Sequence, residues 1–333
     1  MEPIITWQVD GMDELFQLLR KKYKWSAHDL TLRFVTLLYY ISDKSFDEQE
    51  YDETLKFIKK NTKMFSIYRG HQMFSIAALL ATRFDDPKNS FQMLLEYEHQ
   101  LRKNKFKHTP YLGIAAYALM LTCPEEYLQE RIQKTIDIYQ KMKQHHFWLT
   151  SSDDYPIAVL LAGSEKNIDA LADEMERCYK KLSEAGFSKG NGLQFVSHLL
   201  TFSPESVEDK VERCKKIYVF LKHHKLALSP TYYGIIGYLA LLGDEYAKAL
   251  EDIVEIVQYL KSKNFAKGFY KDMNVLISTA LVCNQYAEKY KIQQNLIETG
   301  VGISIEAMIA AQTAALIAVT TAATTAVTTA SGN

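Results

Sequence analysis

Apolar residues along this chain fall into two kinds of segment that alternate from about residue 25 to residue 286. One kind is apolar almost throughout and rich in small side chains, as in 112–121 and 232–242. The other kind is amphipathic, with large apolar residues three or four positions apart, such as Tyr179 and Leu182. Such spacing places these residues on one face of a helix, so the pattern predicts an all-α chain of paired helices.

A large apolar residue closes each amphipathic segment, directly after a basic or polar last turn. Successive marks are 40, 41, 41, 40, 39 and 39 residues apart. Positive charge at this place complements the negative end of a helix dipole. The period indicates a repeated helix hairpin of about forty residues. The marks are Trp25, Phe65, Phe106, Phe147, Phe187, Leu226 and Phe265.

Helix start signals follow the marks. Thr109–Pro110 places a capping hydroxyl before a proline, which suits the first helical position. Ser26 with Asp29, and Ser151 with Asp154, match the spacing of a capping box. We therefore expect each strongly apolar helix to begin just after a mark.

The apolar helix of each hairpin cannot be left in contact with water on any side. It needs cover from its own amphipathic helix and from both neighbouring hairpins. This predicts a solenoid or ring of about six helix-hairpin repeats. Residues 1–286 form the predicted helical-repeat domain, with 1–25 as an N-terminal cap. Residues 287–333 form a C-terminal segment with an Ala/Thr-rich helix and a frayed end.

The composition restricts the expected partners and cellular compartment of the protein. Lys plus Arg number 39 and Asp plus Glu 40, for a net charge of -1, so we expect no nucleic acid partner, although a local basic strip is compatible with this balance. The four cysteines form no CxxC pair and suit a reduced compartment. Residues 1–11 contain no secretory signal pattern, so we expect a cytoplasmic protein.

Polar residues near the starts of the apolar helices are the candidates for ligand or partner binding. Equivalent positions line up along one side of a solenoid, so they predict a polar stripe that grips a peptide or polar ligand. The alternative is that these groups are buried and satisfied by neighbouring helix ends. The candidates are Arg69, His71, Gln72, Asp153, Asp154, Gln194 and His198.

Catalytic and metal sites are not predicted. Adjacent Asp153 and Asp154 offer carboxylates, but neighbouring helical residues diverge by about 100 degrees, and a capped helix start explains them equally well. His198 lies in an apolar segment, where a hydrogen-bonded core histidine is the simpler interpretation. We expect no metal and no cofactor, and the sequence favours a protein without enzymatic activity over an enzyme.

The stretch from Ala307 to Asn333 contains no charged residue. Small-residue faces suit close helix contacts, so this segment is predicted to pack on the last hairpin or on another copy, giving a homo-oligomer. A membrane anchor is the less favoured alternative, because Ala and Thr contribute little to insertion and no basic or aromatic belt flanks the segment.

Four strings in order carry a family resemblance: Tyr68–His71, Phe147–Tyr155, Gln194–Leu200 and Ile305–Gln312. Together they resemble the bacterial family catalogued as domain of unknown function four thousand and three. The resemblance spans nearly the whole chain and implies a helical protein of Gram-positive bacteria. It implies no activity, so no catalytic role is carried over to any residue.

These observations favour an interaction module that presents a groove to a peptide or protein partner. A small-molecule binder or enzyme, with a polar site on the first helices of the repeats, is one alternative. A membrane-peripheral or tail-anchored assembly factor is the other.

Overall fold

The computed structural model describes residues 3–42, 44–268 and 271–289, and within them it contains fourteen α-helices and no β-strand. The prediction of an all-helical chain is confirmed for these residues. The predicted Ala/Thr-rich helix lies outside them, and α14 (Lys271–Lys289) is the last helix described.

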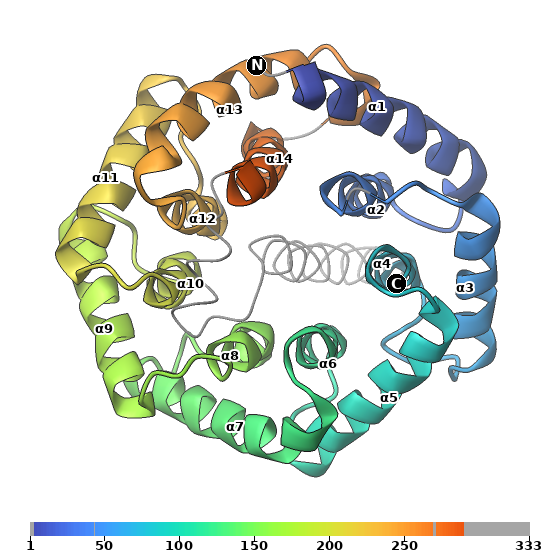
Figure 1. Ribbon diagram of the computed structural model, residues 1–333, viewed down its shortest axis with the longest axis horizontal. Coiled ribbons are helices and arrows are strands. Elements are labelled where there is room, and N and C mark those ends of the chain that lie inside the picture. Colours follow the sequence, from blue (N-terminus) through green and yellow to red (C-terminus); the bar gives the residue numbers. More distant parts are fainter. Residues whose placement is uncertain (1–2, 43, 269–270, 290–333) are drawn as a thin grey trace, which may run out of the picture.

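The helices form two concentric rings (Figure 1). Helices of the inner ring are seen end-on, and those of the outer ring lie tilted around them. The outer helices are α1 (Pro3–Tyr23), α3 (Glu48–Lys60), α5 (Pro87–Lys103), α7 (Leu128–His145), α9 (Ile168–Glu184), α11 (Val207–His223) and α13 (Tyr246–Leu260). The inner helices are α2 (Asp29–Ile41), α4 (His71–Arg83), α6 (Pro110–Thr122), α8 (Tyr155–Leu161), α10 (Asn191–Leu199), α12 (Gly234–Ala240) and α14.

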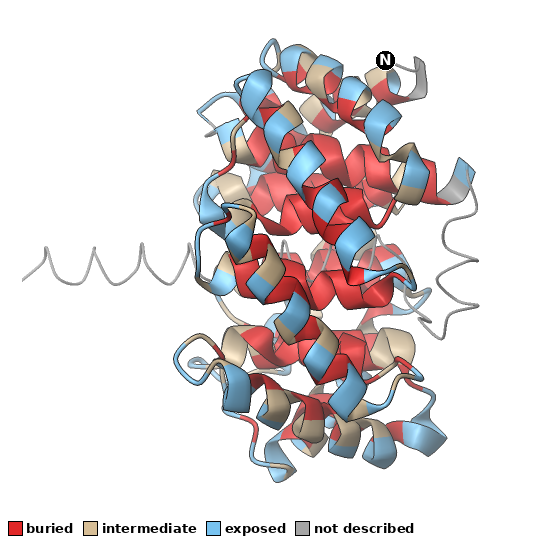
Figure 2. Ribbon diagram, turned by 90° about the vertical axis from the view of Figure 1, so that its left-hand side faces the viewer, coloured by how far each residue is buried: buried red, intermediate tan, exposed pale blue. Residues whose placement is uncertain are grey.

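Each outer helix is amphipathic and buries one edge. In α9 the buried residues include Leu171, Met175, Cys178 and Leu182, which recur at helical spacing. The side chain of Asn167 caps the helix by accepting hydrogen bonds from the first-turn backbone. Exposed residues follow the solvent edge of the outer helices and buried residues follow the edge that faces the inner ring (Figure 2).

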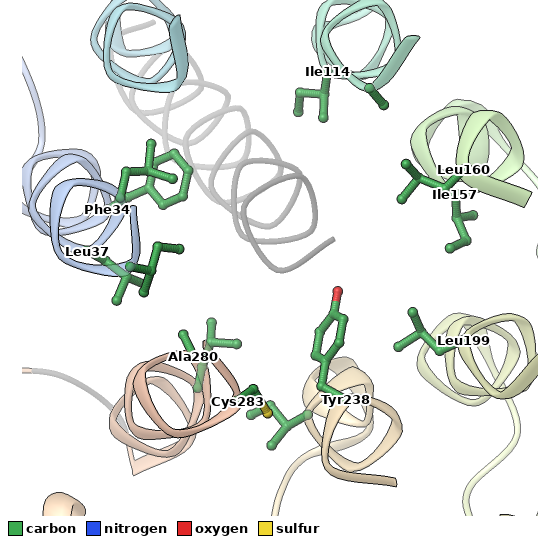
Figure 3. Packing of buried hydrophobic residues seen from close by; sticks show 14 of the residues in the cluster. Phe34, Leu37, Ile114, Ile157, Leu160, Leu199, Tyr238, Ala280 and Cys283 are labelled. Carbon is green, nitrogen blue, oxygen red and sulfur yellow. The ribbon is translucent and has the colours of Figure 1, made fainter. Parts of the chain in front are cut away.

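The inner helices are buried nearly all round. In α6 every residue from Leu112 to Leu119 is buried. Side chains such as Ile114, Ile157 and Leu199 point from the inner helices toward the centre of the ring (Figure 3). Each inner helix packs against its outer partner and stands between two other inner helices in the ring (Figure 1). The inner helices pack most closely where α2 meets α4, α6 meets α8 and α10 meets α12. The burial required by the apolar sequence is thus supplied from several directions.

The first and last hairpins meet and close the ring. Helix α1 lies beside α13, and α2 lies beside α14. The Tyr259 hydroxyl donates a hydrogen bond to Asp10 at 2.8 Å, and the backbone N–H of Phe265 donates to Asp13. The rings of Phe16 and Phe265 pack edge to face, with centroids 5.7 Å apart. Segments some 250 residues apart in sequence are therefore joined.

The inner helices all begin on one face of the ring, which we call the loop face. Contacts between successive helix starts run around this face: the His28 N–H reaches His71, Asn191 reaches Asp153, and Ser229 reaches Asp272. The loop face comprises residues 24–28, 61–70, 104–109, 146–154, 185–190, 224–233 and 261–268, which connect each outer helix to the following inner helix.

The inner helices end on the opposite face, which we call the turn face. Cations from neighbouring elements donate to carbonyl groups at these ends. Lys166 reaches the carbonyl of Thr201 at 2.7 Å, and Arg213 reaches that of Ala240 at 2.9 Å. Such contacts satisfy orphan carbonyl groups and oppose the negative end of each helix dipole. The turn face comprises residues 44–47, 84–86, 123–127, 162–167, 200–206 and 241–245.

The start signals are only partly correct. The capping box of Ser151 with Asp154 is confirmed, and Pro110 is the first residue of α6. The Thr109 hydroxyl makes no cap hydrogen bond, so its predicted capping role is wrong. The box at Ser26 is also wrong, because α2 begins at Asp29 and its N-cap position is held by His28.

The closing contacts yield a stability prediction. Replacing Asp13 by Ala removes the acceptor of the Phe265 N–H and leaves this donor without its charged partner. We expect the free energy of unfolding to fall by about 1–3 kcal/mol, measured by urea denaturation. The exposed neighbour Glu14 serves as control, since Glu14→Ala should change it by less than about 0.5 kcal/mol. Equal effects of the two substitutions would contradict the role of this closing bond.

Candidate functional site

The three candidates at the start of α4 have separate surroundings. The Arg69 guanidinium donates to the carbonyls of Lys59 and Thr62, so it closes the C-terminal end of α3. The His71 ring stacks on His28 with centroids 3.7 Å apart. Burial, together with the neighbouring His28, lowers the pKa of His71. The Nε2 group of Gln72 is buried without a hydrogen-bond partner among the described residues.

The acidic pair lies at the start of the eighth helix. Asp153 and Asp154 end the short 3₁₀ turn η2 (Ser152–Asp154), which leads into α8. The Ser151 N–H donates to the Asp154 carboxylate at 2.9 Å, and Asn191 reaches Asp153 at 3.4 Å. Asp154 is buried and Asp153 is partly exposed, so the two carboxylates do not share one environment.

Burial dominates the chemistry of Asp154. Loss of solvation, helped by the charge of Asp153, raises the pKa of Asp154 to about 8, against the opposing hydrogen bond from Ser151. The carboxyl is therefore mostly protonated near neutral pH. A protonated carboxyl fills a helix start without a buried charge, which agrees with a structural role.

Gln194 and His198 lie in a buried polar cluster between α7, α9 and α10. Gln194 donates to the Thr150 hydroxyl at 2.9 Å. His198 is 2% exposed, and its Nδ1 has no partner among the described residues. Burial, with a smaller effect of His146, lowers the pKa of His198 to about 3, so the ring is neutral. His146 Nε2 lies 2.9 Å from the Glu176 carboxylate, on the other side of this cluster.

The candidate residues do not form one groove. Asp153, Gln194 and His198 belong to neighbouring hairpins, but Arg69, His71 and Gln72 lie at the start of α4, which α6 separates from α8. The cavity that includes His146 and His198 holds only about 10 Å³, roughly one water molecule. Among the described residues, no group of three or more His, Cys, Asp or Glu side chains has metal-binding geometry.

Exposed aromatic residues on the loop face were not among the candidates. Trp25 is 90% exposed, Phe65 94% and Trp148 92%. Phe147 and Met64 beside them are also exposed. Large apolar side chains are rarely this open to water when packing is their purpose. The sequence signal that could have identified these residues was the forty-residue spacing of the marks, because Trp25, Phe65 and Phe147 are three of the seven.

The remaining marks are buried. Phe106 packs edge to face on Tyr155 with ring centroids 4.8 Å apart, and Phe187 packs on Tyr233 at 5.2 Å. Leu226 and Phe265 are also buried. The same register position thus serves as core in four hairpins and as exposed surface in three.

Basic residues surround the exposed aromatics. Asp153 and Asp154 are the only acidic residues in the loop-face segments, and all the lysines of these segments except Lys263 are exposed. Lys24 lies over the Trp25 ring, 5.2 Å from its centroid. The basic residues of these segments are Lys24, Lys63, Arg69, Lys105, Lys107, Lys189, Lys225, Lys261, Lys263 and Lys267.

The turn face has the opposite charge. Its only basic residues are Lys44 and Lys166 in the segments that the structure describes. Both donate to backbone carbonyls, so their charges are engaged locally. The ring is therefore basic and aromatic on one face and acidic on the other. The acidic residues are Asp47, Asp85, Asp86, Glu125, Glu126, Glu165, Glu205, Asp244 and Glu245.

A cavity of about 470 Å³ opens at the loop face between the end of α5 and α7. Lys103, Lys105 and Lys143 line it together with Tyr139 and Tyr155. These lysines are exposed, and within the described residues none has a carboxylate at ion-pair distance. The cavity combines positive charge with aromatic walls, which suits an anionic group.

Comparison with known proteins identifies the family. The family model described as "protein of unknown function (DUF4003)" matches residues 15–314. The chain belongs to this family. The uncharacterized protein YeaA of Bacillus subtilis (strain 168) is 30% identical over 304 residues, which cover 90% of this chain and 89% of the relative. The resemblance predicted from the four strings is confirmed.

The DUF4003 family carries no assigned activity, so function rests on the chain itself. No solved structure matches the chain. None of the helices among the described residues has both the length and the apolarity that a bilayer-spanning segment needs.

The raised pKa of Asp154 predicts how stability of this DUF4003 protein depends on pH. A carboxyl whose pKa is raised by folding favours the native state below its ordinary value near 3.8, and this stability is lost as pH rises through about 8. The Asp154→Asn variant keeps an acceptor for Ser151 without a titrating group. Its stability relative to wild type should grow by about 1.4 kcal/mol per pH unit between these values.

Urea denaturation at several pH values measures this gain. The exposed Asp173 provides the control, since Asp173→Asn should leave the pH profile of wild type unchanged. A stability difference for Asp154→Asn that stays constant from pH 5 to pH 8 would contradict a raised pKa at Asp154.

Proposed function

We propose that this protein is an interaction module that binds its partner through the loop face. The proposal is supported by the gathering of exposed aromatic and basic side chains on this one face. Trp25, Phe65 and Trp148 carry the apolar contribution, and lysines beside them, such as Lys24 and Lys63, carry the charge. Exposed apolar patches rimmed by charge commonly mark interaction surfaces.

One observation carries the proposal: a single register position is buried in four hairpins and exposed in the other three. Where the position is needed for packing, as at Phe106 and Phe187, it is covered by the next hairpin. Trp25 and Phe65 occupy the same junction yet make no comparable packing. Their exposure therefore needs a reason outside the ring, and a partner supplies one.

The forty-residue period fits this proposal. We infer that the seven outer-inner hairpins are copies of one repeating unit, with loop-face tips specialised in some copies. This inference is supported by the position of every mark between the end of an outer helix and the start of an inner helix. Repeated hairpins give a rigid frame on which single loops can change without disturbing the fold.

Binding is better supported than catalysis. Asp154 and His198, the titratable candidates with the largest pKa shifts, are buried separately and do not face a common cavity. The expected self-association through the C-terminal segment lies outside the described residues. An exposed aromatic and basic face of this kind suits a peptide or protein partner and a membrane surface alike.

A photo-crosslinking experiment tests the proposed function. The amino acid p-benzoylphenylalanine replaces Trp148 in the full chain, expressed in bacterial cells and irradiated. We expect adducts of defined mass, to protein or to lipid, because residue 148 is 92% exposed on the loop face. The matched control places the same amino acid at Tyr127, which is 55% exposed on the turn face. Equal adduct yields at positions 148 and 127 would refute binding through the loop face.

A further inference from the structure

We propose that the partner of the loop face is the surface of an anionic phospholipid bilayer. This inference rests on the proposed function and names its partner. The chain would lie flat on the membrane, with the loop face toward the lipid headgroups and the turn face toward water.

The placement of the exposed aromatics fits a flat partner. Trp25, Phe65 and Trp148 lie in the loops before α2, α4 and α8. Helices α2 and α4 are neighbours on one side of the ring, and α8 stands across the ring from them (Figure 1). All three loops belong to the same face. A planar surface can touch all three tips at once, whereas a single peptide would have to bridge the ring.

Exposure of the same residues argues against a groove. Side chains at least nine-tenths exposed, as Trp25, Phe65 and Trp148 are, protrude from the surface and do not line a cleft. A protein partner would need three separate pockets to receive them. The headgroup region of a bilayer yields to protruding rings, and Trp is enriched at that depth because its ring is apolar with one polar group.

Charge supplies the second attraction and the orientation. Anionic lipids attract basic residues close to the surface, by about 1 kcal/mol for each Lys or Arg. The exposed lysines Lys24, Lys63 and Lys105 all lie on the face that carries the aromatic tips. The acidic turn face is repelled by the same surface. The ring would therefore approach an anionic membrane in one orientation, even though its net charge is only -1.

The cavity beside α7 fits a lipid headgroup. Lys103, Lys105 and Lys143 surround a space of about 470 Å³ at the level of the loop face. A phosphate group placed there could accept hydrogen bonds from lysine ammonium groups. Asp153 and Asp154 both lie near Tyr139 in the wall. Burial raises the pKa of Asp154 to about 8, so of this pair Asp153 is the carboxylate that opposes the three lysines at neutral pH.

Sedimentation with vesicles tests the proposal on the full chain. Vesicles of phosphatidylcholine alone are compared with vesicles of equal parts phosphatidylcholine and phosphatidylglycerol. We expect binding to the mixed vesicles only, weakening as salt screens the lysines. The triple variant Trp25→Ala, Phe65→Ala, Trp148→Ala should bind at least about tenfold more weakly. Because these side chains are exposed, its thermal unfolding should match that of wild type.

A matched control removes exposed apolar residues elsewhere. Met93, Tyr127 and Val219 are between 40% and 57% exposed and lie outside the loop face. Their triple alanine variant should bind mixed vesicles as wild type does. The charge variant Lys24→Glu, Lys63→Glu, Lys105→Glu should lose binding and its dependence on salt.

Tryptophan fluorescence reports insertion directly. The chain has three tryptophans, and the Trp7→Phe variant leaves only Trp25 and Trp148, both on the loop face. Transfer of the indole rings from water to mixed vesicles should shift this emission to shorter wavelength, and brominated phosphatidylcholine in the same vesicles should quench it. Absence of quenching, or equal vesicle binding by the aromatic triple variant and wild type, would overturn the proposal.

Single-stranded polyuridylate, as a competitor, separates lipid from nucleic acid. Tighter binding to polyuridylate than to mixed vesicles would overturn the lipid proposal in favour of a nucleic acid. A protein adduct at position 148 together with no vesicle binding would refute the lipid partner while leaving the proposed function standing. Failure of both the crosslink and the vesicle experiment would refute both.

Discussion

Helices that are apolar on all sides determine this architecture. In α6, the residues from Leu112 to Leu119 are buried without a break, so no side of the helix is available to water. Full burial of one large aliphatic side chain is worth about 1.5–3 kcal/mol. An open stack would expose an inner helix at each end. Closing α1 and α2 against α13 and α14 gives every inner helix two inner neighbours and removes that cost.

All the outer helices run in the same direction around the ring, so charge preferences at their two ends give the molecule one basic face and one acidic face. Basic residues such as Lys59 and Lys60 end outer helices, where they complement the helix dipole. Acidic residues such as Glu48 begin them. Because every outer helix runs toward the loop face, these small preferences add. The result is a ring with little net charge and strong polarity between its faces, which total composition conceals.

Much of the fold follows from the sequence, because it depends on short-range pattern. The apolar and amphipathic segments predicted the inner and outer helices, and the marks predicted where one gives way to the other. The sequence pattern predicted either a closed ring or an open solenoid and did not distinguish the two. Ring closure depends on contacts such as Phe265 with Asp13, which join positions 252 apart, and no periodicity reports such a pair.

The candidate site was less predictable, because polar groups near helix starts have local uses. Arg69 closes α3, Asp154 caps the start of α8, and Gln194 bonds to Thr150. Sequence spacing aligned them as a stripe, but Arg69 and Asp154 make their contacts within their own hairpins, and Gln194 joins its hairpin to the preceding one. The burial of His198 agrees with the interpretation as a core histidine, although its Nδ1 has no hydrogen-bond partner in the part of the chain that the structure describes.

Whether the side chain of a mark is buried or exposed could not be predicted from the sequence of its own hairpin. The ring of Phe106 is covered by Tyr155, at the start of α8, and the ring of Phe187 by Tyr233, just before α12. In both cases the cover comes from the next hairpin. In these two hairpins the covering ring stands 49 and 46 positions further along the chain, outside the hairpin that carries the mark. The marks are thus buried in four hairpins and exposed in three on the same ring of helices, so the loop tips can differ in exposure without a change in the arrangement beneath them.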